Sequence, residues 1–75
     1  MPYIAIKAYP KDEATQKAAI ERINQVILEI WGCPQEAVTI SLESVDPADW
    51  NEKVYKQEIE PNLEKMRILS GKKKY

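Results

Sequence analysis

The second residue of the chain is the first candidate for chemistry. The sequence opens Met-Pro, and a methionine that precedes a small residue is commonly cleaved. Removal of Met1 leaves Pro2 with a free secondary amine, which can act as a base. A general base works best when its pKa lies near the operating pH, and an ordinary α-amino group has a pKa of about 7.7–8.0. The alternative is structural, because a proline at the start of a strand leaves no sheet hydrogen bond unmade.

Few other side chains can titrate near neutrality or hold a metal. The chain has no histidine, and Cys33 is its only cysteine. Cys33 therefore lacks a disulfide partner, and without a histidine to activate it we do not expect a nucleophile. No spacing of residues predicts a metal site, and we expect neither metal nor cofactor.

Length and charge exclude several function classes. The chain has 75 residues, 11 of them basic and 12 acidic, with a net charge of −1. This balance does not predict a nucleic-acid-binding surface. The lysines at 72–74 could bind nucleic acid, but a solvated end is the more ordinary interpretation, and we expect a flexible tail over residues 70–75. We find no signal peptide and no apolar run of about 20 residues, so we expect a cytoplasmic protein without membrane partners.

Two segments have the alternating pattern of β-strands. Residues 3–9 place Ile4 and Ile6 on one face, and residues 37–45 place Ile40 and Leu42 on one face. In both segments the opposite face is mixed, with tyrosine, threonine and serine side chains.

A long helix is predicted between these two strands. Asp12 is a suitable N-cap, and apolar residues then recur at steps of three and four until Gly32, a typical C-terminal stop. A strand, a helix and a strand in this order predict a β-α-β unit with parallel strands and a right-handed crossover.

The remaining chain predicts broken helices. Asp46 is an N-cap followed by Pro47 at the first helical position. Pro61 disfavours a helical Glu60, so a second short helix is expected to begin there. This second helix is expected to carry Leu63, Met66 and Arg67 and to end at Ser70 and Gly71.

Such a chain is expected to form a homo-oligomer. A sheet of two strands is not stable alone, its edges are open, and a chain of this length buries only about 60% of its unfolded surface. A second copy would complete the sheet, and it would place Pro2 near a subunit boundary.

The order of these elements behind a Met-Pro start resembles the 4-oxalocrotonate tautomerase family. The segments MPYIAIKAYP, VTISLESVDPADW and EIEPNLEKM look like its PptA-type branch, which consists of small tautomerases with a helical C-terminal segment. The resemblance implies an α/β (α+β) fold of the tautomerase/MIF-like type over residues 1–75, a single domain whose sheet is completed by oligomerisation. It favours a homodimer, with a hexamer as the alternative.

The resemblance also implies residue roles. Pro2 matches the amino-terminal proline that transfers a proton between two atoms of the substrate. Lys11 falls near one of the family's carboxylate-binding arginines, and Trp50 matches the aromatic residue that walls the pocket. Thr39 stands where founding members have their second arginine, which argues against a dicarboxylate substrate. Lys7 and Arg67 are alternative cations.

The expected function is therefore a cofactor-independent keto–enol tautomerase acting on a small 2-oxo or 2-hydroxy-enoic acid similar to phenylpyruvate. A dehalogenase or hydratase reaction could use the same proline. The alternative, from another class of function, is a catalytically silent α/β dimerisation or ligand-binding module.

Overall fold

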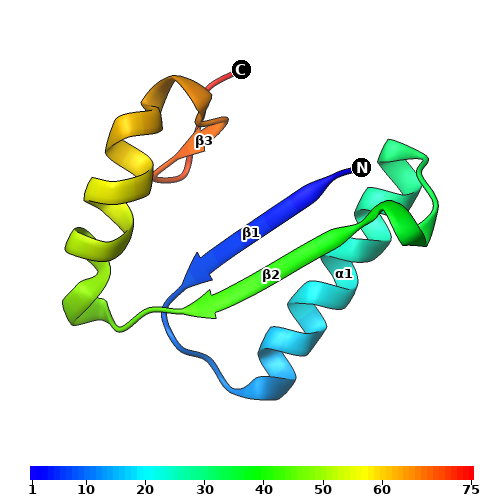
Figure 1. The fold of residues 1–75 in the computed structure, drawn as a ribbon, viewed down its shortest axis with the longest axis horizontal. Coiled ribbons are helices and arrows are strands. Elements are labelled where there is room, and N and C mark those ends of the chain that lie inside the picture. Colours follow the sequence, from blue (N-terminus) through cyan, green and yellow to red (C-terminus); the bar gives the residue numbers. More distant parts are fainter. The chain divides into compact units, whose positions relative to one another are not determined.

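The computed structural model describes the whole chain, Met1–Tyr75, which divides into two compact units, Met1–Ser44 and Val45–Tyr75. The first unit contains, in order, β1 (Tyr3–Ala8), α1 (Glu13–Trp31), the 3₁₀ turn η1 (Gln35–Ala37) and β2 (Thr39–Ser44) (Figure 1). The two strands pair in parallel, from Tyr3 beside Thr39 to Ala8 beside Ser44. The predicted β-α-β unit with parallel strands is confirmed.

Both ends of α1 form as the sequence predicts. The Asp12 carboxylate accepts hydrogen bonds from the Thr15 hydroxyl at 2.5 Å and from the Thr15 backbone N–H at 3.3 Å. These two bonds hold the pKa of Asp12 below its usual value, the hydroxyl having the larger effect. At the other end Gly32 has φ 69°, a left-handed conformation that glycine adopts without strain, and its N–H donates to the Leu28 carbonyl at 3.2 Å.

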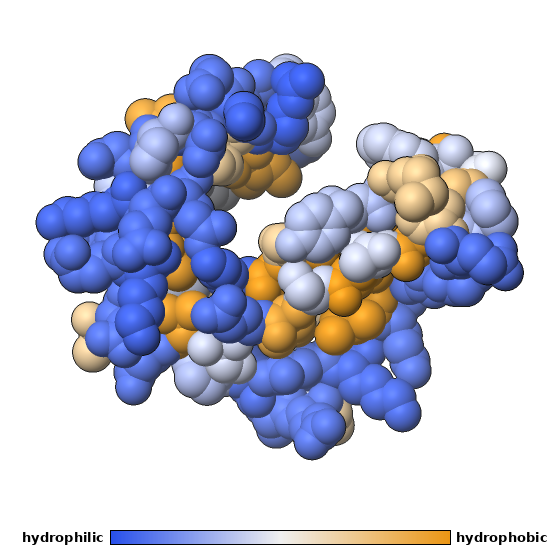
Figure 2. Space-filling model, in the orientation of Figure 1, coloured by the Kyte–Doolittle hydropathy of each residue, from blue (hydrophilic) through white to orange (hydrophobic).

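The β-α-β unit encloses few of its apolar side chains. Ile4, Ile6, Ile40 and Leu42 are only half-buried between the sheet and α1, and no residue of α1 is buried. On the helix, Val26, Ile30 and Trp31 are 54%, 76% and 67% exposed. Figure 2 shows hydrophobic atoms at the surface of this unit. A single copy thus leaves much of the predicted core face open to water.

The second unit is built from short helices. It contains η2 (Pro47–Asp49, 3₁₀), η3 (Asn51–Ile59, a π-helix) and η4 (Glu60–Lys65, 3₁₀). The Asp46 side chain caps η2 by accepting from the Ala48 N–H at 3.5 Å, as predicted. The two most buried side chains of the protein, Val45 and Val54, belong to this unit and are 4% and 5% exposed.

A short antiparallel hairpin, β3 (Ile68–Leu69) with β4 (Lys72–Lys73), completes the second unit. The prediction that Met66 and Arg67 continue the last helix is wrong, because that helix ends at Lys65 and Met66 is extended. Ser70 and Gly71 do not end a helix either. They have φ values of 49° and 83° and form the turn of the hairpin, so part of the predicted tail pairs with β3.

Candidate active site

Pro2 lies directly before β1, where its backbone is anchored from one side. Its carbonyl accepts a hydrogen bond from the Thr39 N–H at 3.2 Å, and its side chain is half-buried. By the alternation of the strand, Pro2 has the parity of Ile4 and Ile6, which face α1. Met1 is 94% exposed, so the bond that joins it to Pro2 lies at an accessible end of the chain. Loss of Met1 therefore leaves a free amine on a residue whose carbonyl is held in the sheet.

Thr39 has a role that sequence reasoning missed. The sequence offered it only as an uncharged residue at the position of a family arginine. In the structure it begins β2, pairs with Tyr3, and provides the backbone donor for Pro2. No residue type signals this contact. Only the register of a parallel pair could have indicated it, because any residue except proline supplies the same N–H.

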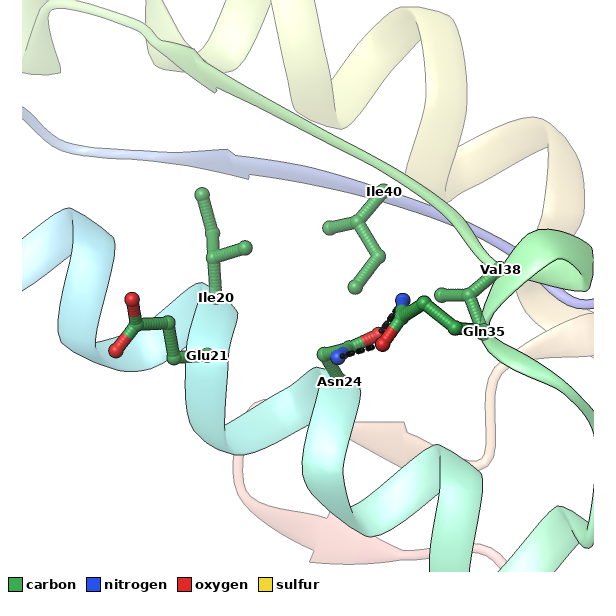
Figure 3. A pocket seen from close by; sticks show the side chains of 6 residues that line it. All are labelled: Ile20, Glu21, Asn24, Gln35, Val38 and Ile40. Atoms are coloured by element: carbon green, nitrogen blue, oxygen red, sulfur yellow. Dashed lines mark hydrogen bonds between the residues drawn. The ribbon is translucent and has the colours of Figure 1, made fainter.

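An open hollow lies between α1 and β2 at this end of the sheet. Its volume is about 250 Å³, and Ile20 and Ile40 point into it from the two elements (Figure 3). At its margin the side-chain amides of Asn24 and Gln35 exchange two hydrogen bonds, of 2.9 and 2.8 Å. The lining residues are Ile20, Glu21, Asn24, Gln35, Val38 and Ile40.

Lys11 lies at the opposite end of β1 from Pro2. The six residues of β1 separate them, and at about 3.3 Å per residue this is about 20 Å, farther than a lysine side chain reaches. The Lys11 carbonyl accepts from the Gln16 side chain at 2.9 Å, and the same amide donates to the Ser44 hydroxyl at 3.2 Å. One chain therefore does not bring Pro2 and Lys11 together.

A second cavity lies at the Lys11 end of the unit. It has a volume of about 160 Å³, and its walls are largely apolar, with polar groups from the β1–α1 loop and the first turns of α1. The lining residues are Ile6, Ala8, Tyr9, Lys11, Thr15, Gln16, Ala19, Ile23 and Leu42.

The other predicted site residues lie elsewhere. Trp50 belongs to the second unit, where it is half-buried between η2 and η3, and its backbone N–H donates to the Pro47 carbonyl. Of the alternative cations, Lys7 is half-buried within β1, and Arg67 is exposed just before β3.

No three His, Cys, Asp or Glu side chains gather as a metal site. None of the helices has both the length and the apolar character that crossing a membrane requires.

Comparison with known proteins identifies the family. No family model matches the sequence, but curated relatives do. Tautomerase PptA of Cronobacter sakazakii is 32% identical over 73 residues, which cover 95% of this chain and 96% of that protein. Tautomerase PptA of Enterobacter sp. strain 638 is 32% identical over 88% of this chain and 90% of its own length. Tautomerase PptA of Pectobacterium atrosepticum is 25% identical over 95% and 96% of the two chains. The chain thus belongs to the small tautomerases of the 4-oxalocrotonate tautomerase family, and it is an isomerase.

Proposed function

We propose that this tautomerase interconverts the enol and keto forms of a small 2-oxo acid similar to phenylpyruvate, with the Pro2 amine as general acid and base and without a cofactor. The observation that carries the proposal is the placement of Pro2. Its carbonyl is held by Thr39 while the bond to Met1 lies at an exposed end of the chain. Cleavage at that bond produces an amine that is both fixed in the sheet and reachable by a substrate.

The reaction needs one proton to move between two substrate atoms. In the enol-to-keto direction, the neutral Pro2 nitrogen takes the proton of the 2-hydroxyl group as the C2–O bond gains double-bond character. The resulting ammonium returns this proton to C3, which completes the ketone and regenerates the neutral amine. No electron acceptor is needed, because the C=C bond and the O–H bond are replaced by a C=O bond and a C–H bond.

The surroundings must favour the neutral form of this amine. A secondary amine is more basic than an ordinary α-amino group, and both partial burial and a nearby cation lower the pKa of an amine. Pro2 is half-buried on the apolar face of the sheet. We assign the cation to Lys11, whose ammonium also attracts the carboxylate of the substrate, and we assign to Trp50 the stacking of an aryl substituent.

This assignment requires more than one copy of the chain. Because β1 separates Lys11 from the Pro2 of its own chain, a Lys11 that acts at Pro2 comes from another copy. Two copies that lie antiparallel place the Lys11 end of one beside the Pro2 end of the other. The exposed apolar residues of α1, Val26, Ile30 and Trp31, provide surface for such an assembly. We propose a homodimer, with a hexamer as the larger alternative.

The test combines intact mass with the enol-to-keto conversion of phenylpyruvate on tag-free protein. We expect a mass that lacks one methionine, and a decrease of kcat by about 100-fold or more in Pro2→Ala. Because alanine leaves a primary amine, a second sample should retain Met1 through inhibition of methionine removal. It has the same side chains but an acylated Pro2 nitrogen, and it should be inactive.

The matched control is Pro10→Ala, which alters an exposed proline after β1 and should preserve activity. Full activity in the sample that retains Met1 would exclude the Pro2 amine as the base, because its nitrogen is then an amide. Dehalogenation of a halogenated acid, or addition of water to an unsaturated acid, in place of phenylpyruvate conversion would retain the base but redirect the proposal to dehalogenase or hydratase chemistry.

A further inference from the structure

We propose that Asn24 and Gln35 are positioning residues for the Pro2 base. Their paired side-chain amides, which we call the amide clasp, join α1 to the turn before β2. The start of β2 in turn holds Pro2. This inference rests on the proposed function of Pro2, and it assigns to the clasp the task of keeping that amine in place during turnover.

The amide clasp consists of two reciprocal hydrogen bonds between side chains. The Asn24 Nδ2 donates to the Gln35 Oε1 at 2.9 Å, and the Gln35 Nε2 donates to the Asn24 Oδ1 at 2.8 Å (Figure 3). Each amide donates one bond and accepts one bond. A carboxylate at either position could only accept, so the full pair requires two amides.

The turn η1 and the start of β2 connect the clasp to Pro2. Gln35 is the first residue of η1, and its backbone carbonyl accepts from the Val38 N–H at 3.1 Å. The next residue is Thr39, whose N–H donates to the Pro2 carbonyl at 3.2 Å. The side chain of Gln35 thus fixes the turn whose final residues place the donor for Pro2.

Pro2 and the turn before Thr39 have few other interactions that would hold them in place. Once Met1 is removed, Pro2 is a chain terminus, and terminal residues are poorly ordered unless they are tied down. The carbonyl of Pro2 accepts from the Thr39 N–H, and this hydrogen bond links the backbone of Pro2 to β2. The turn before Thr39 is a 3₁₀ segment of three residues, a form with weak internal hydrogen bonds. It borders the open hollow of about 250 Å³, so close packing does not hold it.

The experiment compares Asn24→Ala with wild type in two measurements. We expect kcat for enol-to-keto conversion to fall about tenfold, with little change in KM, because the base is displaced while the groups that bind the substrate are unchanged. We also expect hydrogen exchange at the Thr39 amide to become about tenfold faster, since the bond to Pro2 opens more often. If Asn24→Ala does not fold, Asn24→Asp preserves the shape and the acceptors but removes the donor.

Two further variants separate positioning from general stability. Gln25→Ala is the matched control, because the Gln25 amide donates to Glu29 at 3.1 Å within α1 and makes no hydrogen bond to η1. It should retain wild-type kcat and wild-type exchange at Thr39. The double variant Asn24→Gln with Gln35→Asn restores two amides of the same total length, and it should recover most of the lost kcat.

The outcomes distinguish this inference from the proposed function. If Pro2→Ala is inactive but Asn24→Ala has wild-type kcat and only a lower melting temperature, the clasp is structural and the inference fails. If the sample that retains Met1 is fully active, the proposed function fails. Hydrogen exchange at the Thr39 amide does not depend on catalysis and still tests the clasp in that case. An unchanged exchange rate in Asn24→Ala would show that the clasp does not stabilise the hydrogen bond from Thr39 to Pro2.

Discussion

The Asp12 carboxylate determines how α1 begins, and its ionisation should be visible in the stability of the protein. Its hydrogen bonds from Thr15 lower its pKa in the folded state. A carboxyl group with a depressed pKa in the folded state stabilises the fold above its unfolded pKa, and this contribution is lost as the pH falls through the folded pKa. The cap should therefore be complete at neutral pH and should weaken below about pH 4.

Thermal unfolding of wild type and Asp12→Asn between pH 7 and pH 2 tests this prediction. Asparagine is also a good N-cap but does not titrate, and the other carboxyl groups are common to both proteins. The melting temperature of wild type should therefore fall relative to Asp12→Asn as the pH drops below about 4. Parallel curves over the whole range would show that the ionisation of Asp12 does not contribute to the stability of α1.

At this scale the sequence predicts part of the candidate site. The chemistry of Pro2 makes it a candidate, because cleavage of Met1 would leave an amine that can titrate near neutrality, and the family resemblance favours it over a purely structural role. Lys11 and Trp50 came only from a family resemblance. The bond from Thr39 and the clasp between Asn24 and Gln35 were missed, because they depend on strand register and on where a turn brings two ordinary amides. Such contacts have no signature in residue type.

At the scale of elements, local rules worked where a segment is long and its ends are chemically marked. The period of α1, the cap at Asp12 and the stop at Gly32 all agree with the structure. The C-terminal half was less predictable. Apolar spacing indicates a helix there, but segments of nine and six residues contain too few apolar positions to distinguish 3₁₀, α and π forms. Strands of two residues, such as β3 and β4, are too short to show alternation.

The hairpin did carry a turn signal in its Ser-Gly pair. Ser70 and Gly71 both have positive φ, the combination found in type I′ turns, which favour Asn-Gly. We therefore predict that Ser70→Asn stabilises the hairpin, because asparagine tolerates the left-handed region better than serine. The Lys74 N–H donates to the Arg67 carbonyl across the hairpin at 2.7 Å. Larger cross-strand nuclear Overhauser effects between Ile68 and Lys73, and slower exchange at the Lys74 amide, would report the gain. Equal or weaker signals would show that the turn does not limit the hairpin.

At the scale of the whole molecule, much of the apolar surface of the β-α-β unit is exposed, and a second copy of the chain would cover it. No residue of Met1–Ser44 is fully buried, although this unit holds the longest helix and the parallel sheet. A chain of this size with a single cysteine and no histidine has few ways to gain stability other than association. The same association would bring together the two ends of β1, where Pro2 and Lys11 lie, from different copies. Stability and catalysis would then depend on the same interface.

Mixing of two inactive variants tests this dependence. Pro2→Ala and Lys11→Ala should each have low kcat/KM when assayed alone with phenylpyruvate. After unfolding and refolding together, half of the dimers contain one chain of each kind. In a site shared between chains, these mixed dimers have one site with both substitutions and one with neither, so about a quarter of wild-type activity should return.

The activity recovered after mixing differs if Pro2 and Lys11 act within one chain. Every site then carries one substitution in every combination, and mixing restores nothing. Pro2→Ala mixed with the double variant Pro2→Ala and Lys11→Ala is the matched control, since no combination of these chains has an intact site. Absence of recovery in a sample whose mass spectrum shows mixed dimers would contradict the shared site. In that case Lys11 does not bind the substrate beside the Pro2 of the other chain. A different cation would have to bind the carboxylate of the substrate.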